Sequence, residues 1–325
     1  MMSFVSDKPR VLVMMGGPDA ERDVSILSGT AIARALREGD AFDVLELIVD
    51  KPDPDDIASL PAVDVVFPAL HGHWGEGGVL QQMLEDAGIS FVGAGSASAS
   101  LAMDKMRTKT VVSRADVATP LAIEINASDP CRLAPPLVLK PVDDGSSVDI
   151  RICHSQPDID AARAELHPRR SRLMAETFIS GRELTVGVIA ASPDGPSSEV
   201  TLLPIIEIVP SPEVTFYDYD AKYLRADTHY RVAPADLSEA VCYHLNAAAQ
   251  AAWNAVECRD LARVDFRMDD QGKVWFLEIN TMPGFTDHSL LPMAAASIGI
   301  DMTDLCERLV RCALMRIETV HAVRA

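Results

Sequence analysis

The chain has 325 residues, 48% of them hydrophobic, and a formal net charge of −19. Its length and apolar content are enough for two or three α/β units with buried cores, while its charge argues against a surface for nucleic acid or for an anionic membrane. Six cysteines without CxxC or metal-finger spacing, and no apolar run long enough for a signal peptide or a bilayer span, predict a reduced cytoplasmic protein without a membrane partner.

Apolar runs alternate with helical patterns in the first hundred residues, which is typical of an α/β unit. A buried strand over 11–15 is followed by two glycines and then by a helix over 24–36. Further elements are expected in the order strand 44–49, strand 63–70, helix 78–87 and strand 89–92.

Strand-like segments dominate the rest of the chain after Pro135-Pro136. Strands are predicted over 137–141, 173–178, 183–190 and 200–208. A helix is expected over 236–257, where Asp236 and Glu239 have capping-box spacing, and a last amphipathic helix over 302–320.

Residues 263–280 have the pattern of a β-hairpin around an Asp-Asp-Gln-Gly turn. Strand alternation places Arg263 with Asp265, and Glu278 with Asn280, on shared faces. A four-residue loop would set Arg263 opposite Glu278, and Asp265 opposite Phe276, so that all four polar groups point to one side.

This polar face has the ligands of a magnesium site. Carboxylate and amide oxygens suit Mg²⁺ that bridges nucleotide phosphates, and a neighbouring arginine can neutralise charge that develops during a reaction. The alternative is a strand pair with one solvated polar face. The hairpin leads directly into Thr-Met-Pro-Gly-Phe-Thr-Asp-His-Ser, a Gly- and hydroxyl-rich continuation that a solvated hairpin does not need.

Two loops near the N-terminus can approach a ligand. In 16–25 a glycine turn opens a helix, whose N-terminus attracts anions, or whose Glu21 can hold a ligand ammonium; an ordinary capped turn is the alternative. Residues 71–78 follow a buried strand and are rich in glycine, which lets the backbone approach a ligand closely, so a substrate loop is favoured. Metal ligation by His71 with His73 is the weaker alternative. The GxGxxG fingerprint is absent, so a dinucleotide is not expected.

Three later segments have the composition of a nucleotide site. Lys140 ends a strand before Asp-Asp-Gly-Ser-Ser, a loop that can wrap a phosphate or lie free on the surface, and no Walker A motif is present. Residues 176–183 can present backbone groups to an adenine edge, or form a strand, turn and strand with solvated acids. The aromatic segment 216–223 fits a lid over a reactive intermediate, or a packed irregular loop.

Taken together and in this order, these segments resemble the ATP-grasp D-alanine–D-alanine ligases. The resemblance runs from residue 16 to residue 296 and is carried by GGPDAERDVSILSG, HGHWGEGGVLQQMLE, GAGSASASLAMDKMRTK, KPVDDGSSV, ETFISGRELTVGV, FYDYDAKY, RVDF and LEINTMPGFTDHSLLPMAA. It implies a three-domain α/β ATP-grasp fold whose N-terminal domain is Rossmann-like (pre-ATP-grasp). The implied domains are 1–100 for substrate, 101–182 as the central ATP-grasp subdomain, and 183–325 with the metal site and a lid at 216–230.

The resemblance also implies a role for individual residues. Mg²⁺ would be held by Asp265, Glu278 and Asn280. ATP would be bound by its phosphates at Lys105, Lys140 and Lys222, by its adenine at Glu176, Phe178 and Ile179, and by its ribose at Glu183. The reaction would involve Glu21, Ser146 and Tyr223 at the first D-alanine, and Arg263 and Gly284 at the oxyanion. The remaining substrate contacts would come from His71, Ser289 and Leu290.

The activity so implied is ATP-dependent ligation of two D-alanines through a D-alanyl phosphate, which supplies peptidoglycan precursors for the cell wall. Two Mg²⁺ ions, which Mn²⁺ can replace, and a homodimer are expected with it. Tyr223 favours an amine acceptor, because relatives that make D-alanyl-D-lactate tend to carry histidine there. A ligase for D-serine or a hydroxy acid, and a nucleotide-binding protein without catalysis, are the alternatives.

Three positions depart from the family pattern. Gly77 stands where aspartate usually follows Gly-Glu, Asp149 where glycine usually follows Gly-Ser-Ser-Val, and Met282 where serine is common before Pro-Gly. None of them removes a proposed catalytic group. Asp149 is the most consequential, because a carboxylate close to phosphates repels them unless it points away.

Overall fold

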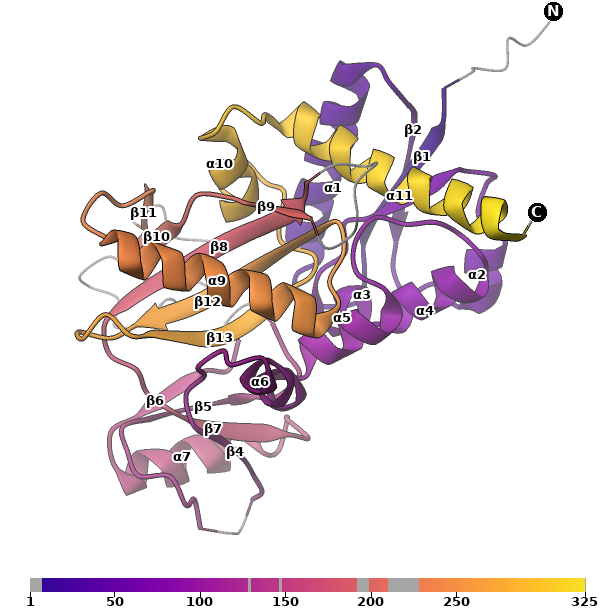
Figure 1. The fold of residues 1–325 in the computed structure, drawn as a ribbon. Helices are drawn as coiled ribbons and strands as arrows, with labels where there is room; N and C mark the ends of the chain where they lie inside the picture. The colour runs from indigo at the N-terminus through magenta and orange to yellow at the C-terminus, as the bar shows by residue number, and fades with distance from the viewer. Residues whose placement is uncertain (1–7, 128–129, 146–147, 192–198, 210–227, 325) are drawn as a thin grey trace, which may run out of the picture.

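In the part of the chain that the structure describes, helices pack around three β-sheets (Figure 1). The structure is a computed structural model that describes residues 8–127, 130–145, 148–191, 199–209 and 228–324, with 317–324 described by backbone alone. The predicted α/β class is confirmed. Among the described residues, no helix has the length and apolar character needed to cross a bilayer.

The first sheet is parallel and has the strand order β2-β1-β3. Its strands are β1 (Arg10–Gly16), β2 (Asp43–Val49) and β3 (Val65–Pro68), as predicted apart from their exact ends. The strand expected over 89–92 is wrong, because only Phe91 makes an isolated bridge, to Val66. The helices of this region are α1 (Arg22–Gly39), α2 (Pro54–Ala58), α3 (Gly72–Glu76), α4 (Val79–Asp86), α5 (Ser96–Met103) and α6 (Lys105–Arg114).

The second sheet is antiparallel, with the order β4-β7-β5-β6. It comprises β4 (Ala122–Ile125), β5 (Leu137–Pro141), β6 (Arg151–Cys153) and β7 (Leu173–Thr177). Helix α7 (Gln156–Leu166) is capped at its N-terminus by Ser155, whose side chain accepts a hydrogen bond from Asp158 N. Its residues Ile159 and Leu166 pack with Leu137 and Leu173 of the sheet. One face of β5 and β7 is therefore covered by α7, and the opposite face of the two strands is directed toward the third sheet.

The third sheet is built around β8 (Arg182–Ala190), with the order β11-β10-β8-β12-β13 and β9 paired to β8. The single strand expected over 200–208 is two strands, β9 (Val200–Leu202) and β10 (Ile206–Val209), with Pro204 between them. Proline has no N–H for a ladder, so a central strand does not continue through it. The remaining strands are β11 (His229–Val232), β12 (Leu261–Met268) and β13 (Val274–Asn280).

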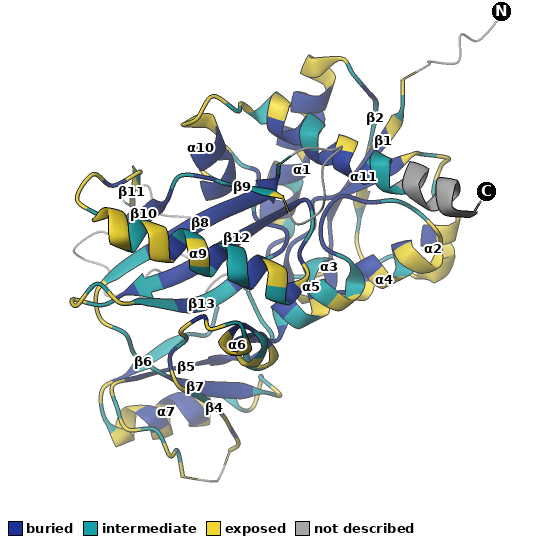
Figure 2. Ribbon diagram, in the orientation of Figure 1, coloured by how far each residue is buried: buried dark blue, intermediate teal, exposed yellow. Residues whose placement is uncertain are grey.

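Helix α9 (Glu239–Val256) covers one face of the third sheet (Figures 1 and 2). Its cap is Ser238, whose side chain accepts a hydrogen bond from Val241 N, so the predicted capping box of Asp236 and Glu239 is wrong. Asp236 instead pairs with Arg182 and Arg231. Two positively charged strand residues thus attract this carboxylate away from the helix end.

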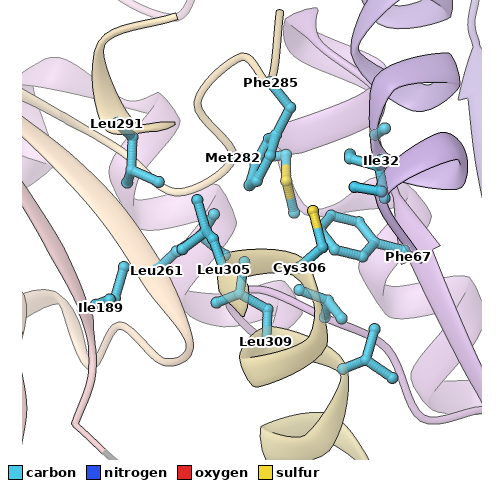
Figure 3. Packing of buried hydrophobic residues seen from close by; sticks show 14 of the residues in the cluster. Ile32, Phe67, Ile189, Leu261, Met282, Phe285, Leu291, Leu305, Cys306 and Leu309 are labelled. Carbon is cyan, nitrogen blue, oxygen red and sulfur yellow. The ribbon is translucent and has the colours of Figure 1, made fainter. Parts of the chain in front are cut away.

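The C-terminal part of the chain returns to the first sheet. Helix α10 (Leu290–Ala296) leads to α11 (Met302–Arg324), which packs against α1. Figure 3 shows Leu305 and Leu309 of α11 in one cluster with Ile32 and Phe67 from the N-terminal region. The two ends of the sequence therefore share one hydrophobic core, which holds the segment after β13 in place.

Candidate active site

A cavity lies between the inner faces of the second and third sheets. Both sheets, the connection from β7 to β8, and the loop after β5 contribute to its walls. The cavity collects most of the residues predicted to bind nucleotide and metal: Lys105, Lys140, Glu176, Phe178, Ile179, Glu183, Asp265 and Glu278. Arg263, predicted for the oxyanion, and Leu290, predicted for the second D-alanine, also line it. Asn280 lines a smaller adjoining cavity that shares Lys105 and Glu278.

The hairpin of β12 and β13 differs in register from the prediction. Arg263 lies opposite Asn280, and Asp265 opposite Glu278, rather than opposite Glu278 and Phe276. The loop from Met268 to Val274 is one residue longer than expected, and the ladder shifts by a β-bulge after Asp265. Sequence alternation cannot reveal such a bulge, because an extra residue breaks the period of two.

The bulge explains how the predicted common face is nevertheless achieved. Leu277 and Glu278 are neighbours in sequence, yet both line the cavity, whereas Phe276 and Ile279 on either side are buried in the core. A regular strand would turn one of the two away. The predicted grouping of Arg263, Asp265 and Glu278 on one face is therefore confirmed, by a different register from the expected one.

Asp265 is held by four donors. Arg263 donates from Nε to Oδ1 at 2.9 Å and from Nη2 to Oδ2 at 2.8 Å. Thr185 Oγ1 donates to Oδ1 at 2.6 Å, and Asn280 Nδ2 donates to Oδ2 at 2.9 Å. Thr185 was not singled out from sequence, since a threonine in a strand carries no signal of its own. This network fixes the carboxylate and places the Arg263 guanidinium beside it.

The acidic groups fit a magnesium ion that is completed by phosphate oxygens. Glu278 is the cross-strand neighbour of Asp265, and Lys105 Nζ lies 3.4 Å from Glu278 Oε2. Positively charged side chains thus already compensate both carboxylates. Over the described ranges, no three His, Cys, Asp or Glu side chains gather as a metal cage. Mg²⁺ commonly takes one or two carboxylates together with substrate phosphates, so this donor set is sufficient.

Glu183 and Arg267 form the edge of the cavity beside the β7–β8 connection. Arg267 Nη1 lies 3.1 Å from Glu183 Oε2, and the same guanidinium donates to the carbonyls of Ile179 and Gly181. Burial raises the pKa of Glu183 to about 7, although Arg267 opposes the rise. Arg267 was missed from sequence, because only the strand pairing brings it to Glu183. It holds the segment that the adenine prediction relies on.

This raised pKa gives a pH-dependent stability. A carboxyl group whose pKa is higher in the folded state stabilises the fold below about pH 4.5, and that contribution is lost as the pH rises through about 7. Glu183→Gln removes the buried charge, so we expect its free energy of unfolding to exceed that of the unsubstituted protein at pH 8 by roughly 1–3 kcal/mol. Urea unfolding at pH 5 and pH 8, without Mg²⁺ or nucleotide, measures this. An equal difference at the two pH values would contradict the assignment.

Two buried lysines hold Glu176 from opposite sides. Lys140 Nζ lies 2.9 Å from Oε1, and Lys109 Nζ lies 2.5 Å from Oε2. The sequence prediction included Lys140 and Glu176 but omitted Lys109. The only sequence feature that could have identified Lys109 is its position four residues after Lys105 on α6, because this spacing puts both lysines on one side of the helix.

The loop after β5 meets the N-terminal region at Gly145. A Cβ atom placed on Gly145 would lie 3.5 Å from Glu21 Oε2 and 3.9 Å from Glu76 Oε1. Two carboxylates of the N-terminal region therefore face the loop that begins beside Lys140. Ser146, Lys222 and Tyr223, together with most of the predicted lid, fall outside the described residues. Glu76, a further missed residue, also accepts a hydrogen bond from Gly72 N.

Ser28 connects His71 to the loop after β13. Its Oγ lies 3.2 Å from His71 Nε2 and accepts a hydrogen bond from Phe285 N at 3.1 Å, and all three groups are buried. The predicted oxyanion donor Gly284 precedes Phe285, and a Cβ on Gly284 would meet Ser289 Oγ at 2.8 Å. The structure thus brings His71, Gly284 and Ser289 together. Ser28 was not singled out, since a buried helix serine is more often structural.

Two of the departures from the family pattern have a local explanation in hydrophobic packing and backbone contact. Met282 is buried in the core of Figure 3 beside Phe285, so the methionine is a packing residue. At Gly77 a Cβ would lie 2.2 Å from the carbonyl oxygen of His73, so this turn favours glycine.

Asp149 is turned away from the cavity. Arg170 Nε lies 2.6 Å from its Oδ2, and Arg169 Nη2 lies 2.8 Å from its Oδ1. Its φ of 60° is the left-handed conformation that glycine adopts readily. Two arginines therefore neutralise the carboxylate, and Arg170 also pairs with Asp144 on the cavity wall.

Comparisons with known proteins agree with this geometry. Residues 109–311 match the family model described as "D-ala D-ala ligase C-terminus", and residues 49–94 match "D-ala D-ala ligase N-terminus". A D-alanine–D-alanine ligase of Syntrophotalea carbinolica is 37% identical over 94% of this chain and 97% of its own length. A ligase of the same name from Bordetella pertussis is 40% identical, over 91% of this chain and 92% of its own.

Solved structures show the same fold. The D-alanine–D-alanine ligase of Bacillus anthracis, complexed with ATP, superposes with a TM-score of 0.81 at 29% identity, over 97% of this chain and 100% of its own. The VanG D-Ala:D-Ser ligase of Enterococcus faecalis superposes with a TM-score of 0.79 at 26% identity, over 94% and 99%. The predicted ATP-grasp fold is thereby confirmed. This chain belongs to the D-alanine–D-alanine ligase family.

Proposed function

We propose that the cavity between the second and third sheets binds ATP, and that the chain uses it to join two D-alanines. The observation that carries this proposal is the convergence of two buried lysines, Lys105 and Lys140, with the carboxylates of Asp265 and Glu278 on one cavity. Cations for phosphates and oxygen ligands for a metal thus lie within a single space. The ATP complex of the similar B. anthracis ligase supports the choice of nucleotide.

The proposed ATP subsites follow the cavity wall. Lys105 and Lys140 contact the phosphates, with Lys222 added from the lid. Phe178 and Ile179 face the adenine together with Glu176, and Glu183 accepts from the ribose hydroxyls. Asp265, Glu278 and Asn280 would hold Mg²⁺, which would supply charge neutralisation at the phosphates. We propose two ions, with Mn²⁺ as a possible replacement, because the family pattern implies them.

The D-alanine subsites lie at the junction with the N-terminal region. Glu21, with Ser146 and Tyr223, is proposed to hold the ammonium of the first D-alanine, and His71 to approach its carboxyl end. The carboxylate of the second D-alanine is proposed to bind at Ser289 and Leu290. Contacts of Ser28 with both His71 and Phe285 support this, since they bring the two proposed subsites into contact.

The residues suggest how the chain assists the reaction. A carboxylate is a poor electrophile, so the first D-alanine is converted to an acyl phosphate before the amine of the second attacks. Arg263 is proposed to stabilise the tetrahedral oxyanion, with the Gly284 N–H as second donor, and its two hydrogen bonds to Asp265, which fix the guanidinium, support this role. Exclusion of water by the 216–230 lid would protect the acyl phosphate from hydrolysis.

We further propose three domains, 1–100, 101–182 and 183–325, and a homodimer in the cytoplasm. The three separate sheets support the division, although α11 packs back on α1. Six free thiols and an ATP-dependent activity support a reducing compartment that contains ATP. The product would serve peptidoglycan synthesis.

D-serine is the second acceptor to consider, because the VanG D-Ala:D-Ser ligase shares the fold. Phosphate release from ATP and Mg²⁺, with D-alanine present or absent, tests the activity, and mass spectrometry of the products identifies the acceptor. We expect D-alanine-dependent release with a D-alanyl-D-alanine product. Equal amounts of D-alanyl-D-serine in a mixed reaction would favour the alternative, and no release with any D-amino acid would overturn the proposal.

A further inference from the structure

Lys109 lies behind the cavity wall rather than on it. Its side chain is 6% exposed and does not line the cavity, whereas its partner Glu176 and the next lysine, Lys140, both do. Burying a charged lysine is unfavourable unless other groups compensate for the lost water. Glu176 is one such group, and the others are the Thr119 hydroxyl and the Phe276 carbonyl.

The partners of Lys109 belong to three different segments. Its Nζ donates to Thr119 Oγ1 at 2.7 Å and to the carbonyl oxygen of Phe276 at 3.4 Å, and lies 2.5 Å from Glu176 Oε2. Thr119 Oγ1 also donates to the Phe276 carbonyl at 3.1 Å, and Phe276 N donates to Ala118 O at 2.8 Å. Lys109 is therefore anchored to β13 directly before its bulge, and it cannot swing toward the nucleotide without breaking these contacts.

Glu176 is consequently shared between two lysines with different surroundings. Lys140 reaches Oε1 from the cavity side, at 2.9 Å, and Lys109 reaches Oε2 from the interior. Two lysines and one glutamate carry a net charge of +1. If Lys109 were neutral, the only cation left for Glu176 in this trio would be Lys140, and the trio would present no net charge to phosphates.

We propose that Lys109 is a positioning residue for ATP, which neutralises Glu176 from behind the wall and so leaves the charge of Lys140 available to the nucleotide phosphates. The proposal rests on the proposed function, because it assumes that this cavity binds ATP. It assigns no chemical step to Lys109.

The protonation states agree with this division of charge. Burial lowers the pKa of Lys109 to about 8, against the opposing effect of Glu176, so the side chain remains mostly protonated at pH 7. Burial alone would raise the pKa of Glu176, but Lys109 and Lys140 hold it below its usual value. Lys109 and Glu176 are thus both charged near neutral pH.

A charge-balance experiment separates this role from a merely structural one. The KM for ATP and kcat are measured at saturating D-alanine for the unsubstituted protein, Lys109→Met, Glu176→Gln and the double variant, with ADP affinity by calorimetry. We expect Lys109→Met to raise the KM for ATP roughly 10- to 100-fold, as for loss of one buried charge partner, with a smaller change in kcat. In the double variant the net charge returns to +1, and the KM for ATP should fall back to near that of Glu176→Gln.

The controls distinguish the possible failures. Lys109→Arg keeps the charge and should retain ATP affinity, and Lys51→Met removes an exposed lysine and should change nothing. A double variant that binds ATP as weakly as Lys109→Met would overturn the proposal. If Lys109→Met does not fold, Thr119→Val decides: a normal KM for ATP supports the charge role, and a loss like that expected for Lys109→Met contradicts it. If the unsubstituted protein does not bind ADP, it is the proposed ATP site that fails.

Discussion

Glu278→Ala is expected to abolish ATP turnover while the fold survives. Glu278 faces Asp265 across the bulged hairpin and lies beside Lys105, so its removal eliminates one of two carboxylates proposed to hold Mg²⁺. We expect D-alanine-dependent ADP release to fall by roughly 10³-fold, the size of effect seen when a preorganised electrostatic group is lost. Its side chain is 28% exposed, so we expect little loss of stability to accompany the change.

Circular dichroism and thermal unfolding check that the variant is folded. Glu38→Ala is a matched control, because Glu38 is an exposed glutamate on α1 far from the hairpin in sequence. It should leave turnover unchanged. Near-normal ATP turnover by Glu278→Ala, measured at several Mg²⁺ concentrations, would contradict the proposal that Glu278 holds Mg²⁺.

Arg263→Met is expected to lower kcat by roughly 10²–10³-fold with little change in the KM for ATP, because one donor to a developing oxyanion is lost. The side chain is 9% exposed and makes paired hydrogen bonds to Asp265. Its removal leaves Asp265 with Thr185 and Asn280 as donors, so some loss of stability should accompany the loss of rate.

The variant Arg263→Lys tests whether the positive charge of Arg263 is enough or whether its guanidinium geometry is needed. Lysine keeps the positive charge but cannot reproduce the fixed fork of the guanidinium, so we expect kcat between those of Arg263→Met and the unsubstituted protein. Steady-state kinetics with ATP and D-alanine varied separately give the required kcat and KM values. A large rise in the KM for ATP at unchanged kcat would instead place Arg263 in nucleotide binding.

Much of the hairpin could be predicted from sequence, and the part that could not has a physical reason. The alternation of residues 263–280 correctly grouped Arg263, Asp265 and Glu278 on the cavity face. The predicted register of the hairpin was wrong, because a β-bulge after Asp265 and a longer loop add residues that the alternation of polar and apolar side chains does not show. Polarity identifies the face of a strand, while the pairing depends on the backbone of the partner.

Residues that act through other residues were the ones missed. Three of them, Lys109, Ser28 and Arg267, contact the predicted site residues Glu176, His71 and Glu183. Each of these contacts joins segments that lie far apart in sequence. Glu176 and Lys140 were found because they end strands in recognisable motifs. Tertiary pairing decides such contacts, as it also decided that Asp236 binds Arg182 and Arg231 rather than capping α9.

A crystal structure of the protein with a non-hydrolysable ATP analogue and Mg²⁺ tests the central claim most directly. The predicted result has the phosphates at Lys105 and Lys140, the adenine beside Phe178, and Mg²⁺ between the phosphates and the carboxylates of Asp265 and Glu278. A nucleotide bound outside the cavity between the second and third sheets, or a metal held without either carboxylate, would contradict it.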